Sequence, residues 1–271
     1  APAAGCDPEQ AVEMGGSGVT LNVICLKFGD SYGAEYVNRL RLAILRNTTG
    51  PLRILCMTDD PRGIDKEVEI LALPQEPYAE RMIVAMSKAR VQGRLQKISL
   101  FKPDLVSDLD GPLIVLDLDI VVVGDLTELA DFAPGKVCLR REWNAQPGQL
   151  GHGSVEKFDP KLHAYLYEDM LLDPEGSVAL GGGSEQNYTS LNAERHGDFV
   201  PFPDDWIASF KRDCRPPRPL NLIFSPRLPP AAKVICFHGN PKMSEAIGGY
   251  RAGPFKSTRK AEWLTRAWSD E

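Results

Sequence analysis

The chain has 271 residues, of which 43% are apolar, so it is long enough for one large α/β domain with a substantial core. Its net charge of -6 and isoelectric point of about 5.4 argue against nucleic acid as the main partner, because surfaces that bind phosphate backbones are rich in Lys and Arg. No uninterrupted apolar run approaches the roughly 20 residues of a transmembrane helix, and the first basic residue is Lys27. We therefore expect a soluble, cytoplasmic protein with no transmembrane segment.

The six cysteines show no Cys-x-x-Cys pair and no compact spacing of the kind that indicates a disulfide framework or a zinc site. Four of them lie in apolar, strand-like runs, where a free cysteine behaves as a small buried hydrophobe: Cys25, Cys56, Cys138 and Cys236. We expect reduced thiols, with neither zinc binding nor thiol catalysis.

The first half of the chain alternates predicted strands and helices. Residues 1–18, rich in Ala, Gly, Glu and Pro, have no periodicity and are expected to form a flexible leader to a domain at 19–271. Apolar runs predict strands at 21–26, 53–58 and 68–73, and apolar residues at helical spacing predict helices at 34–47 and about 93–101. This order favours an α/β sheet.

Polar residues follow the first two predicted strands. In open α/β sheets the loop after the first strand commonly lines a nucleotide site, so Asp30 and Tyr32 are candidate contacts. The alternative is that Asp30 caps the next helix and Tyr32 packs on it. Asp59, after the second strand, is a candidate acceptor for a base or ribose hydroxyl, although Asp-Asp-Pro also fits a plain turn.

The segment at the centre of the prediction is an apolar run at 113–116, which has no polar face and suits a strand covered on both sides. Asp117 and Asp119 follow it, and they point to the same side, toward the ligand crevice, if the backbone stays extended. Two close carboxylates repel unless a cation joins them. Mg²⁺ or Mn²⁺ is commonly held by one or two carboxylates and by substrate phosphates, so the pattern predicts a metal-diphosphate site, with a solvated turn as the alternative.

Further candidates lie on either side of this segment. Lys97, on the predicted helix before it, is placed to reach phosphate oxygens, with a solvated helix face as the alternative. After it we expect a helix near 126–132, strands at 136–140 and 154–158, and a helix at 160–172. The glycines at 181–183 lack the Lys-Ser/Thr of a Walker loop, and they place Ser184 as a helix N-cap with Glu185 or Gln186 facing the space they leave.

The last third of the chain carries a basic loop and a second polar strand end. Residues 211–219 are basic and Pro-rich, and we expect a stiff exposed connection, with contact to an acceptor or closure over a diphosphate as the alternative. A buried strand at 233–237 ends in His238, and Lys242 follows. An imidazole there can complete an octahedral Mn²⁺ site and the lysine can neutralise a leaving phosphate, whereas a structural histidine is the alternative. A helix at 262–268 closes the chain.

Together these features, from about residue 21 to 242, resemble a nucleotide-sugar-dependent glycosyltransferase of the GT-A fold, most nearly glycosyltransferase family eight and its bacterial relatives. The most specific segment, 113–126, reads Leu-Ile-Val-Leu-Asp-Leu-Asp-Ile-Val-Val-Val-Gly-Asp-Leu and is similar to that family's metal-binding strand. The loop with Asp30 and Tyr32 is similar to its nucleotide contact. The sequence departs from the family in its His-Gly-Asn-Pro-Lys-Met segment, where the histidine and lysine stand closer together, and in Glu-Gln-Asn at 185–187 in place of Asp-Gln-Asp.

The resemblance implies an α/β fold of the GT-A type, a single domain with a mixed, mostly parallel central sheet flanked by helices. It implies transfer of a sugar from a nucleoside diphosphate sugar, UDP-linked, to a hydroxyl of a carbohydrate, lipid-linked or other acceptor. Asp117, Asp119 and His238 would bind Mn²⁺ or Mg²⁺, and Lys242 would bind the diphosphate. Glu185 is the candidate base or stabiliser of the reacting sugar centre, and Gln186 would hold the sugar.

Two other functions fit parts of the pattern. An apolar strand followed by Asp-x-Asp-x-Val also describes a haloacid-dehalogenase-like, Mg²⁺-dependent phosphatase, with Asp117 as its nucleophile. That motif usually follows the first strand of its domain, and no later strand here ends in a second acidic pair. A sugar-nucleotide-binding protein without turnover would carry the same donor-binding residues.

Overall fold

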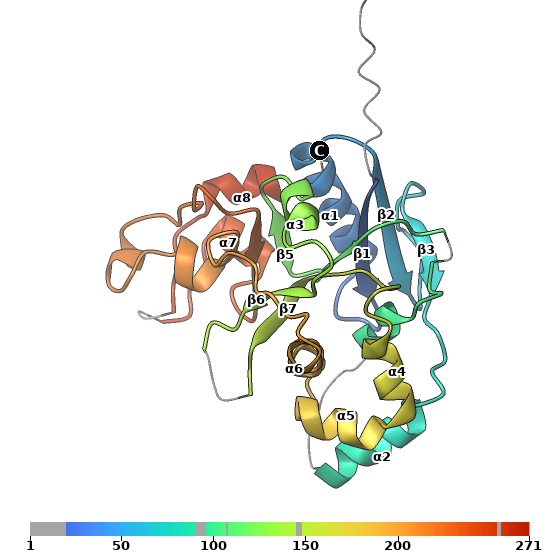
Figure 1. The fold of residues 1–271 in the computed structure, drawn as a ribbon. Coiled ribbons are helices and arrows are strands. Elements are labelled where there is room, and N and C mark those ends of the chain that lie inside the picture. The colour runs from blue at the N-terminus through green and yellow to red at the C-terminus, as the bar shows by residue number, and fades with distance from the viewer. Residues whose placement is uncertain (1–19, 90–95, 107, 145–147, 254–255, 271) are drawn as a thin grey trace, which may run out of the picture.

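The computed structural model describes residues 20–89, 96–106, 108–144, 148–253 and 256–270 (Figure 1). The expected leader at 1–18 and the start of the helix expected at 93–101 lie outside the described residues. In the described chain, helices flank a six-stranded sheet of order β3-β2-β1-β4-β7-β6, beside a three-stranded sheet of order β5-β9-β8. None of the described helices combines the length and the apolar character that crossing a membrane requires.

The large sheet is mixed and mostly parallel, which confirms the predicted fold class. Its parallel part consists of β1 (Leu21–Lys27), β2 (Leu52–Thr58), β3 (Glu69–Ala72) and β4 (Leu113–Leu116). The other part is antiparallel and consists of β7 (Gly151–Phe158), which pairs with β4, and β6 (Cys138–Arg141), which pairs with β7. The small sheet contains β5 (Ile120–Val122), β8 (Ile207–Ser209) and β9 (Val234–Cys236).

The helices cover the faces of the large sheet and of the small sheet. They are α1 (Ala34–Asn47), α2 (Ala79–Ala89), α3 (Thr127–Asp131), α4 (Tyr165–Leu172), α5 (Pro174–Gly181), α6 (Glu185–Arg195), α7 (Met243–Gly248) and α8 (Glu262–Ala267). Residues Gln96–Phe101 form a 3-10 helix rather than the expected α-helix. All four residues of β4 are buried, and they alternate between two apolar cores: Ile114 and Leu116 face one, Leu113 and Val115 the other.

The backbone does not stay extended through the acidic pair. β4 ends at Leu116, a turn carries Asp117 and Asp119, and β5 then leaves the large sheet to pair with β9. Two backbone hydrogen bonds hold this turn, one from the N–H of Asp117 to Ser154 (3.0 Å) and one from the N–H of Phe237 to Asp119 (2.8 Å). The turn therefore joins both sheets, and both acids lie at their junction.

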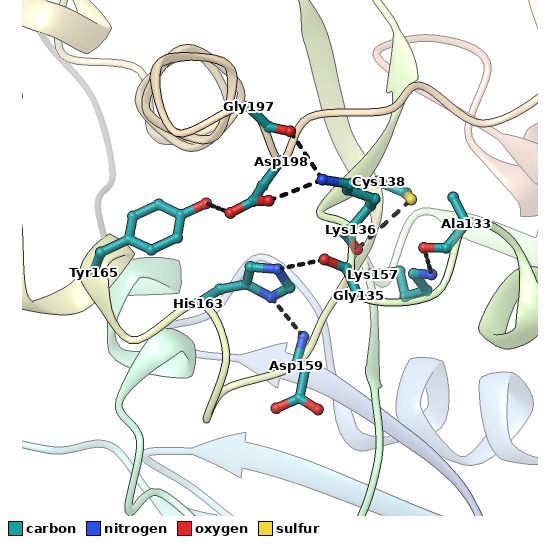
Figure 2. Close-up of polar contacts among 10 residues, drawn as sticks. All are labelled: Ala133, Gly135, Lys136, Cys138, Lys157, Asp159, His163, Tyr165, Gly197 and Asp198. Carbon is teal, nitrogen blue, oxygen red and sulfur yellow. Dashed lines mark hydrogen bonds and ion pairs between the residues drawn. The ribbon is translucent and has the colours of Figure 1, made fainter.

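Polar contacts secure the start of β6 and the end of β7 to the chain around α4 (Figure 2). Nδ1 of His163 accepts a hydrogen bond from the N–H of Asp159 at 2.9 Å, and its Nε2 lies 3.2 Å from the carbonyl oxygen of Gly135. Lys136 and Tyr165 meet on the carboxylate of Asp198, at 3.1 and 3.4 Å. These contacts use both nitrogens of His163, so this histidine has a structural role.

The predicted burial of Cys25, Cys56, Cys138 and Cys236 as free thiols is confirmed. Among the residues that the structure describes, five cysteines are free and buried: Cys25, Cys56, Cys138, Cys214 and Cys236. Burial raises the pKa of the Cys138 thiol to about 11 and that of Cys214 to about 12, so both stay protonated at neutral pH.

Candidate functional site

A cleft with a volume of about 260 Å³ opens at the carboxyl ends of β1 and β4, where ligands bind in open α/β sheets. The sequence singled out ten residues, and six of them line this cleft: Tyr32, Lys97, Asp117, Asp119, Glu185 and Gln186. They come from the loop after β1, the 3-10 helix, the turn after β4 and the first turn of α6. The fold thus brings together segments that are as much as 150 residues apart in sequence.

Lys97 is the cation on one side of the cleft. Its Nζ lies 2.8 Å from Oδ1 of Asp117 and 3.3 Å from Oε1 of Glu156, and it also donates to the carbonyl oxygen of Gly153. Burial alone lowers the pKa of Lys97, but the carboxylates of Asp117, Glu185 and Glu156 outweigh it and raise that pKa well above its usual value. Lys97 therefore stays positively charged and forms ion pairs with Asp117 and Glu156. The alternative prediction, a solvated helix face, is wrong, because the side chain is largely buried.

Asp119 meets a second cation on the other side. The hydroxyl of Tyr32 donates to Oδ2 of Asp119 at 3.2 Å, and Nζ of Lys242 lies 3.4 Å from the same oxygen and 2.9 Å from the Tyr32 hydroxyl. Burial and the nearby charge of Asp117 raise the pKa of Asp119, while Lys242 opposes the shift. Tyr32 also packs edge-on against Tyr36 of α1, with ring centroids 4.9 Å apart. Tyr32 therefore both packs on the helix and lines the cleft.

Glu185 and Gln186 face the cleft from the start of α6. Oε1 of Glu185 is buried and has no hydrogen-bond partner among the described residues. Burial and the neighbouring carboxylate of Glu156 raise the pKa of Glu185 well above its usual value. Gln186 is already engaged, because its Oε1 accepts from the N–H of Gly153 at 2.9 Å. Ser184 stands at the N-cap position but makes no side-chain cap hydrogen bond.

Gly153 leaves the space that this arrangement needs. A Cβ atom at this position would lie 2.9 Å from Oε1 of Glu156 and 3.1 Å from Cβ of Gln186, both too close for an ordinary contact. The absence of a side chain on Gly153 therefore lets Glu156 and Gln186 approach the cleft wall together.

His238 lies in a separate aromatic group next to the cleft. Its Nε2 is 2.8 Å from the hydroxyl of Ser209, and its ring lies 5.1 Å from Trp143 and 5.8 Å from His152 between centroids. Burial, with the charges of Lys211 and Arg212, lowers the pKa of His238. The imidazole is neutral at pH 7 and engaged with Ser209.

The two acids predicted to contact a nucleotide lie outside the cleft lining. Asp30 is exposed, and the helix after it is capped at Gly33 without a side-chain hydrogen bond, so Asp30 does not act as that cap. Oδ2 of Asp59 accepts a hydrogen bond from the N–H of Gly29 at 3.0 Å. Asp59 therefore holds the loop that carries Tyr32, and its effect on the cleft is through the position of that loop.

The chemistry of the cleft fits a divalent cation in part. Asp117 and Asp119 face one space and repel each other. Burial and this repulsion raise the pKa of Asp119, and a cation would relieve the repulsion. Within the described residues, however, no three His, Cys, Asp or Glu side chains are grouped so as to hold a metal. The two carboxylates thus fit a cation whose other ligands are phosphate and water, and His238 is not gathered with them.

Sequence reasoning missed Glu156, Ser209 and the pair Trp143 and His152. Glu156 carried a visible signal, because it is a charged residue inside a predicted strand, and the structure buries it, so its charge needs a partner. The others carried no signal in the sequence. Ser209 ends a three-residue strand that was not predicted. Trp143 lies in a turn after β6, and His152 lies at the start of β7, before the part of that strand that was predicted.

Comparison of the structure with solved structures decides the fold. A galactosyltransferase, LgtC, solved in complex with donor and acceptor sugar analogs, matches with a TM-score of 0.58 at 12% identity, over 91% of this chain and 95% of that chain. Mouse xyloside xylosyltransferase 1 matches with a TM-score of 0.51 at 13% identity, over 82% and 98% of the two chains. This chain has the fold of GT-A glycosyltransferases.

A third match is the glycosyltransferase GlyE of Streptococcus pneumoniae TIGR4, with a TM-score of 0.53 at 14% identity, over 91% of this chain and 60% of that chain. By sequence, no family model and no curated protein matches the chain. The likeness to these glycosyltransferases is therefore one of fold, that is, of how the strands and helices are arranged. It confirms the predicted GT-A fold.

Proposed function

We propose that this protein is a glycosyltransferase that moves a sugar from a nucleoside diphosphate sugar, UDP-linked, to an acceptor hydroxyl. The observation that supports it most is one cleft, at the ligand-binding edge of a glycosyltransferase fold, lined by two carboxylates that are each paired with a lysine: Asp117 with Lys97, and Asp119 with Lys242. A diphosphate carries the charge that such a set of groups recognises, because lysines pair with its oxygens and carboxylates share a cation with it.

The donor end is built from Tyr32, Lys242 and the acidic pair. Tyr32 offers a ring face and a hydroxyl beside the loop after β1, which suits a nucleoside. Lys242 has its ammonium within 3.4 Å of Asp119 and stays charged, because its contacts with Tyr32 and Asp119 outweigh burial and raise its pKa. It is placed to meet the negative charge that builds on the departing diphosphate.

Asp117 and Asp119 would hold the Mn²⁺ or Mg²⁺. When bound, that cation supplies positive charge to both phosphates of the donor. Lys97 positions the carboxylate of Asp117 through its 2.8 Å contact, and Tyr32 does the same for Asp119 through its hydroxyl. In this proposal His238 acts from outside the acidic pair, in the aromatic group next to the cleft, where its Nε2 contacts the hydroxyl of Ser209.

In the reaction the bond from the sugar's anomeric carbon to the phosphate oxygen breaks with its electron pair leaving on the diphosphate. A bond from that carbon to the acceptor oxygen forms, and the acceptor loses its proton. Glu185 is the candidate group that accepts that proton or stabilises the positive charge at the anomeric centre. Its Oε1 has no hydrogen-bond partner among the described residues, and burial together with Glu156 raises its pKa well above the usual value. The side chain of Gln186 lines the cleft, with its Nε2 3.5 Å from Oε2 of Glu142, and would hold the sugar.

The test begins with binding. We expect UDP-sugars with Mn²⁺ to raise the melting temperature more than GDP- or CMP-sugars do, because a ligand that binds only the folded state stabilises it by mass action. We then expect Asp119→Ala to abolish both this shift and the release of UDP. Asp104→Ala, at an exposed acid (77% exposed side chain) outside the cleft, is the matched control and should behave as the wild type.

Two results would contradict the proposal. Phosphate release from p-nitrophenyl phosphate that requires Asp117 would favour the phosphatase alternative instead. Tight UDP-sugar binding without hydrolysis or transfer to any hydroxyl acceptor would indicate a binding protein that has no turnover.

A further inference from the structure

Positive charge is concentrated in one part of this acidic protein. Residues 211–260 contain eleven of its 31 Lys and Arg residues and two of its 37 Asp and Glu residues, which leaves 20 basic and 35 acidic residues elsewhere. Seven of these eleven basic residues are exposed: Arg212, Arg218, Arg227, Arg251, Lys256, Arg259 and Lys260. A surface of this sign on a chain of net charge -6 indicates an anionic partner at that place.

The same region exposes large apolar side chains. Five of the twelve exposed large hydrophobic residues in the described chain fall within nine positions: Leu220 (42%), Leu222 (43%), Ile223 (63%), Phe224 (49%) and Leu228 (38%). They lie on the orange loop that projects at the far left of Figure 1, away from both sheets. Such clustering differs from the scattered exposed apolar residues of ordinary surfaces and marks an interaction site.

Hydrogen bonds join the apolar loop to the second basic segment. Nδ2 of Asn221 donates to the carbonyl oxygen of Ser257 at 2.7 Å, and Nη1 of Arg215 donates to that of Lys256 at 3.4 Å. A cavity of about 500 Å³ lies between the segments, lined by Leu222 together with Arg251, Arg259 and Lys260. Apolar and cationic groups therefore occupy one continuous surface.

We propose that this surface, the exposed residues of 218–228 with Arg251, Lys256, Arg259 and Lys260, docks the protein on a membrane that contains anionic phospholipid. Apolar side chains enter the headgroup region while the cations meet lipid phosphates, and neither interaction alone gives stable binding. A second copy of the chain is disfavoured because it would set like charges against each other. Nucleic acid is disfavoured as the partner because its phosphates would not contact the four exposed aliphatic side chains, Leu220, Leu222, Ile223 and Leu228.

The docking surface is linked to the aromatic group of Trp143, His152 and His238 beside the cleft. A single π-helical turn, Phe210–Cys214, leads from the small sheet toward the docking surface. Nζ of Lys211 lies against Gly239, next to His238, and Nη2 of Arg212 donates to Asn144 at 2.6 Å. Docking would hold the cleft close to the lipid surface, so the acceptor would be a lipid-linked hydroxyl, a consequence that rests on the proposed function.

The test is flotation of the full chain with vesicles of phosphatidylglycerol and phosphatidylcholine in equal parts, and with phosphatidylcholine alone. We expect binding to the anionic vesicles only, and weaker binding at high salt. The double variant Ile223→Ser, Phe224→Ser and the double variant Arg251→Gln, Arg259→Gln should each lower the vesicle partition coefficient by roughly tenfold or more. Leu172→Ser, at a residue 76% exposed on α4, is the matched control and should float as the wild type.

Absence of flotation with anionic vesicles, or equal flotation of the wild type and both double variants, overturns the proposal. A dimer that the Ile223→Ser, Phe224→Ser variant dissociates, without flotation, assigns the surface to a second copy instead. Because the flotation assay needs no donor or acceptor, its outcome is independent of UDP-sugar binding. Failure to float would refute the docking surface but not the proposed activity, and failure to bind UDP-sugars would refute the proposed activity but not the docking surface.

Discussion

Nζ of Lys97 lies 2.8 Å from Oδ1 of Asp117, so a cation from the 3-10 helix is paired with the acid that ends the central strand. Lys242 stands in a similar relation to Asp119, at 3.4 Å. Two acid-lysine pairs thus hold the two acids of the cleft, one more buried than the other: the Lys97 side chain is 13% exposed and that of Lys242 is 33% exposed. The two pairs are expected to contribute differently, the first to stability and the second to turnover.

Replacing Lys97 by Met is expected to destabilise the fold by roughly 3–5 kcal/mol, because removing one member of a buried ion pair leaves the other charges uncompensated. Glu156, which is 1% exposed, would then be buried without its cation. Urea unfolding measures the change. Lys102→Met, at an exposed pair with Asp104, is the control and should cost less than about 1 kcal/mol. Equal costs for the two variants would contradict the burial argument.

Replacing Lys242 by Ala is expected to lower kcat by about 10² to 10³, since it removes a positive charge from the place where the leaving group develops charge. Tyr32→Phe keeps the edge contact with Tyr36 and loses the hydroxyl that bonds Asp119, so it should weaken donor binding by about threefold to tenfold. Steady-state kinetics separate the two effects. Lys161→Ala, at an exposed lysine, should leave both constants unchanged. A Lys242→Ala enzyme with normal kcat would exclude this residue from leaving-group stabilisation.

Much of the fold was predictable because its strands and first helix carry strong local patterns. The prediction of a helix at 34–47 is confirmed residue for residue, since Val37, Leu40 and Ile44 recur at helical spacing and are buried. The weaker helices were missed. α2 buries only Ala85 and exposes Ile83, so its apolar residues do not mark one face, and α5 contains two glycines and a serine, which favour helices poorly.

The site was predictable where chemistry follows a buried strand directly. Asp117 and Asp119 stand out because nothing in a covered strand explains two acids, and the cleft confirms that both face the same space. The mutual arrangement was not predictable. That Lys97 reaches Asp117 depends on how the 3-10 helix packs under β7, and that His238 turns to Ser209 depends on the pairing of β8 with β9. Such long-range pairings leave no trace in the spacing of residues along the chain.

His152 offers a test of the aromatic group beside the cleft. Burial lowers the pKa of His152 to about 4 and His238 adds to the effect, while Glu142 opposes it. Because this folded pKa lies below the usual 6.5, the unfolded chain binds the proton first, and stability is lost as the pH falls from about 6.5 toward 4. NMR titration of the imidazole should show a midpoint near 4, and His238→Gln should raise it. A midpoint near the usual value would show that His152 is open to solvent.

Glu185 gives a pH dependence of the opposite kind. Its folded pKa is raised well above the usual 4.5 by burial and by Glu156, so the folded state keeps a proton that the unfolded state releases. A raised carboxyl pKa makes stability highest below the unfolded pKa and lowers it as the pH climbs toward the folded pKa. Glutamine imitates the protonated acid at every pH, so Glu185→Gln should unfold at the same urea concentration as the wild type near pH 4 and at a higher concentration near pH 8.

The same variant separates stability from chemistry. If Glu185 takes the acceptor proton or stabilises the anomeric centre, Glu185→Gln gains stability at high pH while kcat falls by about 10² to 10⁴. Glu175→Gln, at an exposed acid paired with Arg81, is the matched control, and it should show neither the gain in stability nor the loss of kcat. A Glu185→Gln enzyme that is stabilised and fully active would confine this carboxyl to a structural role, and the proton would then go to another group in the cleft.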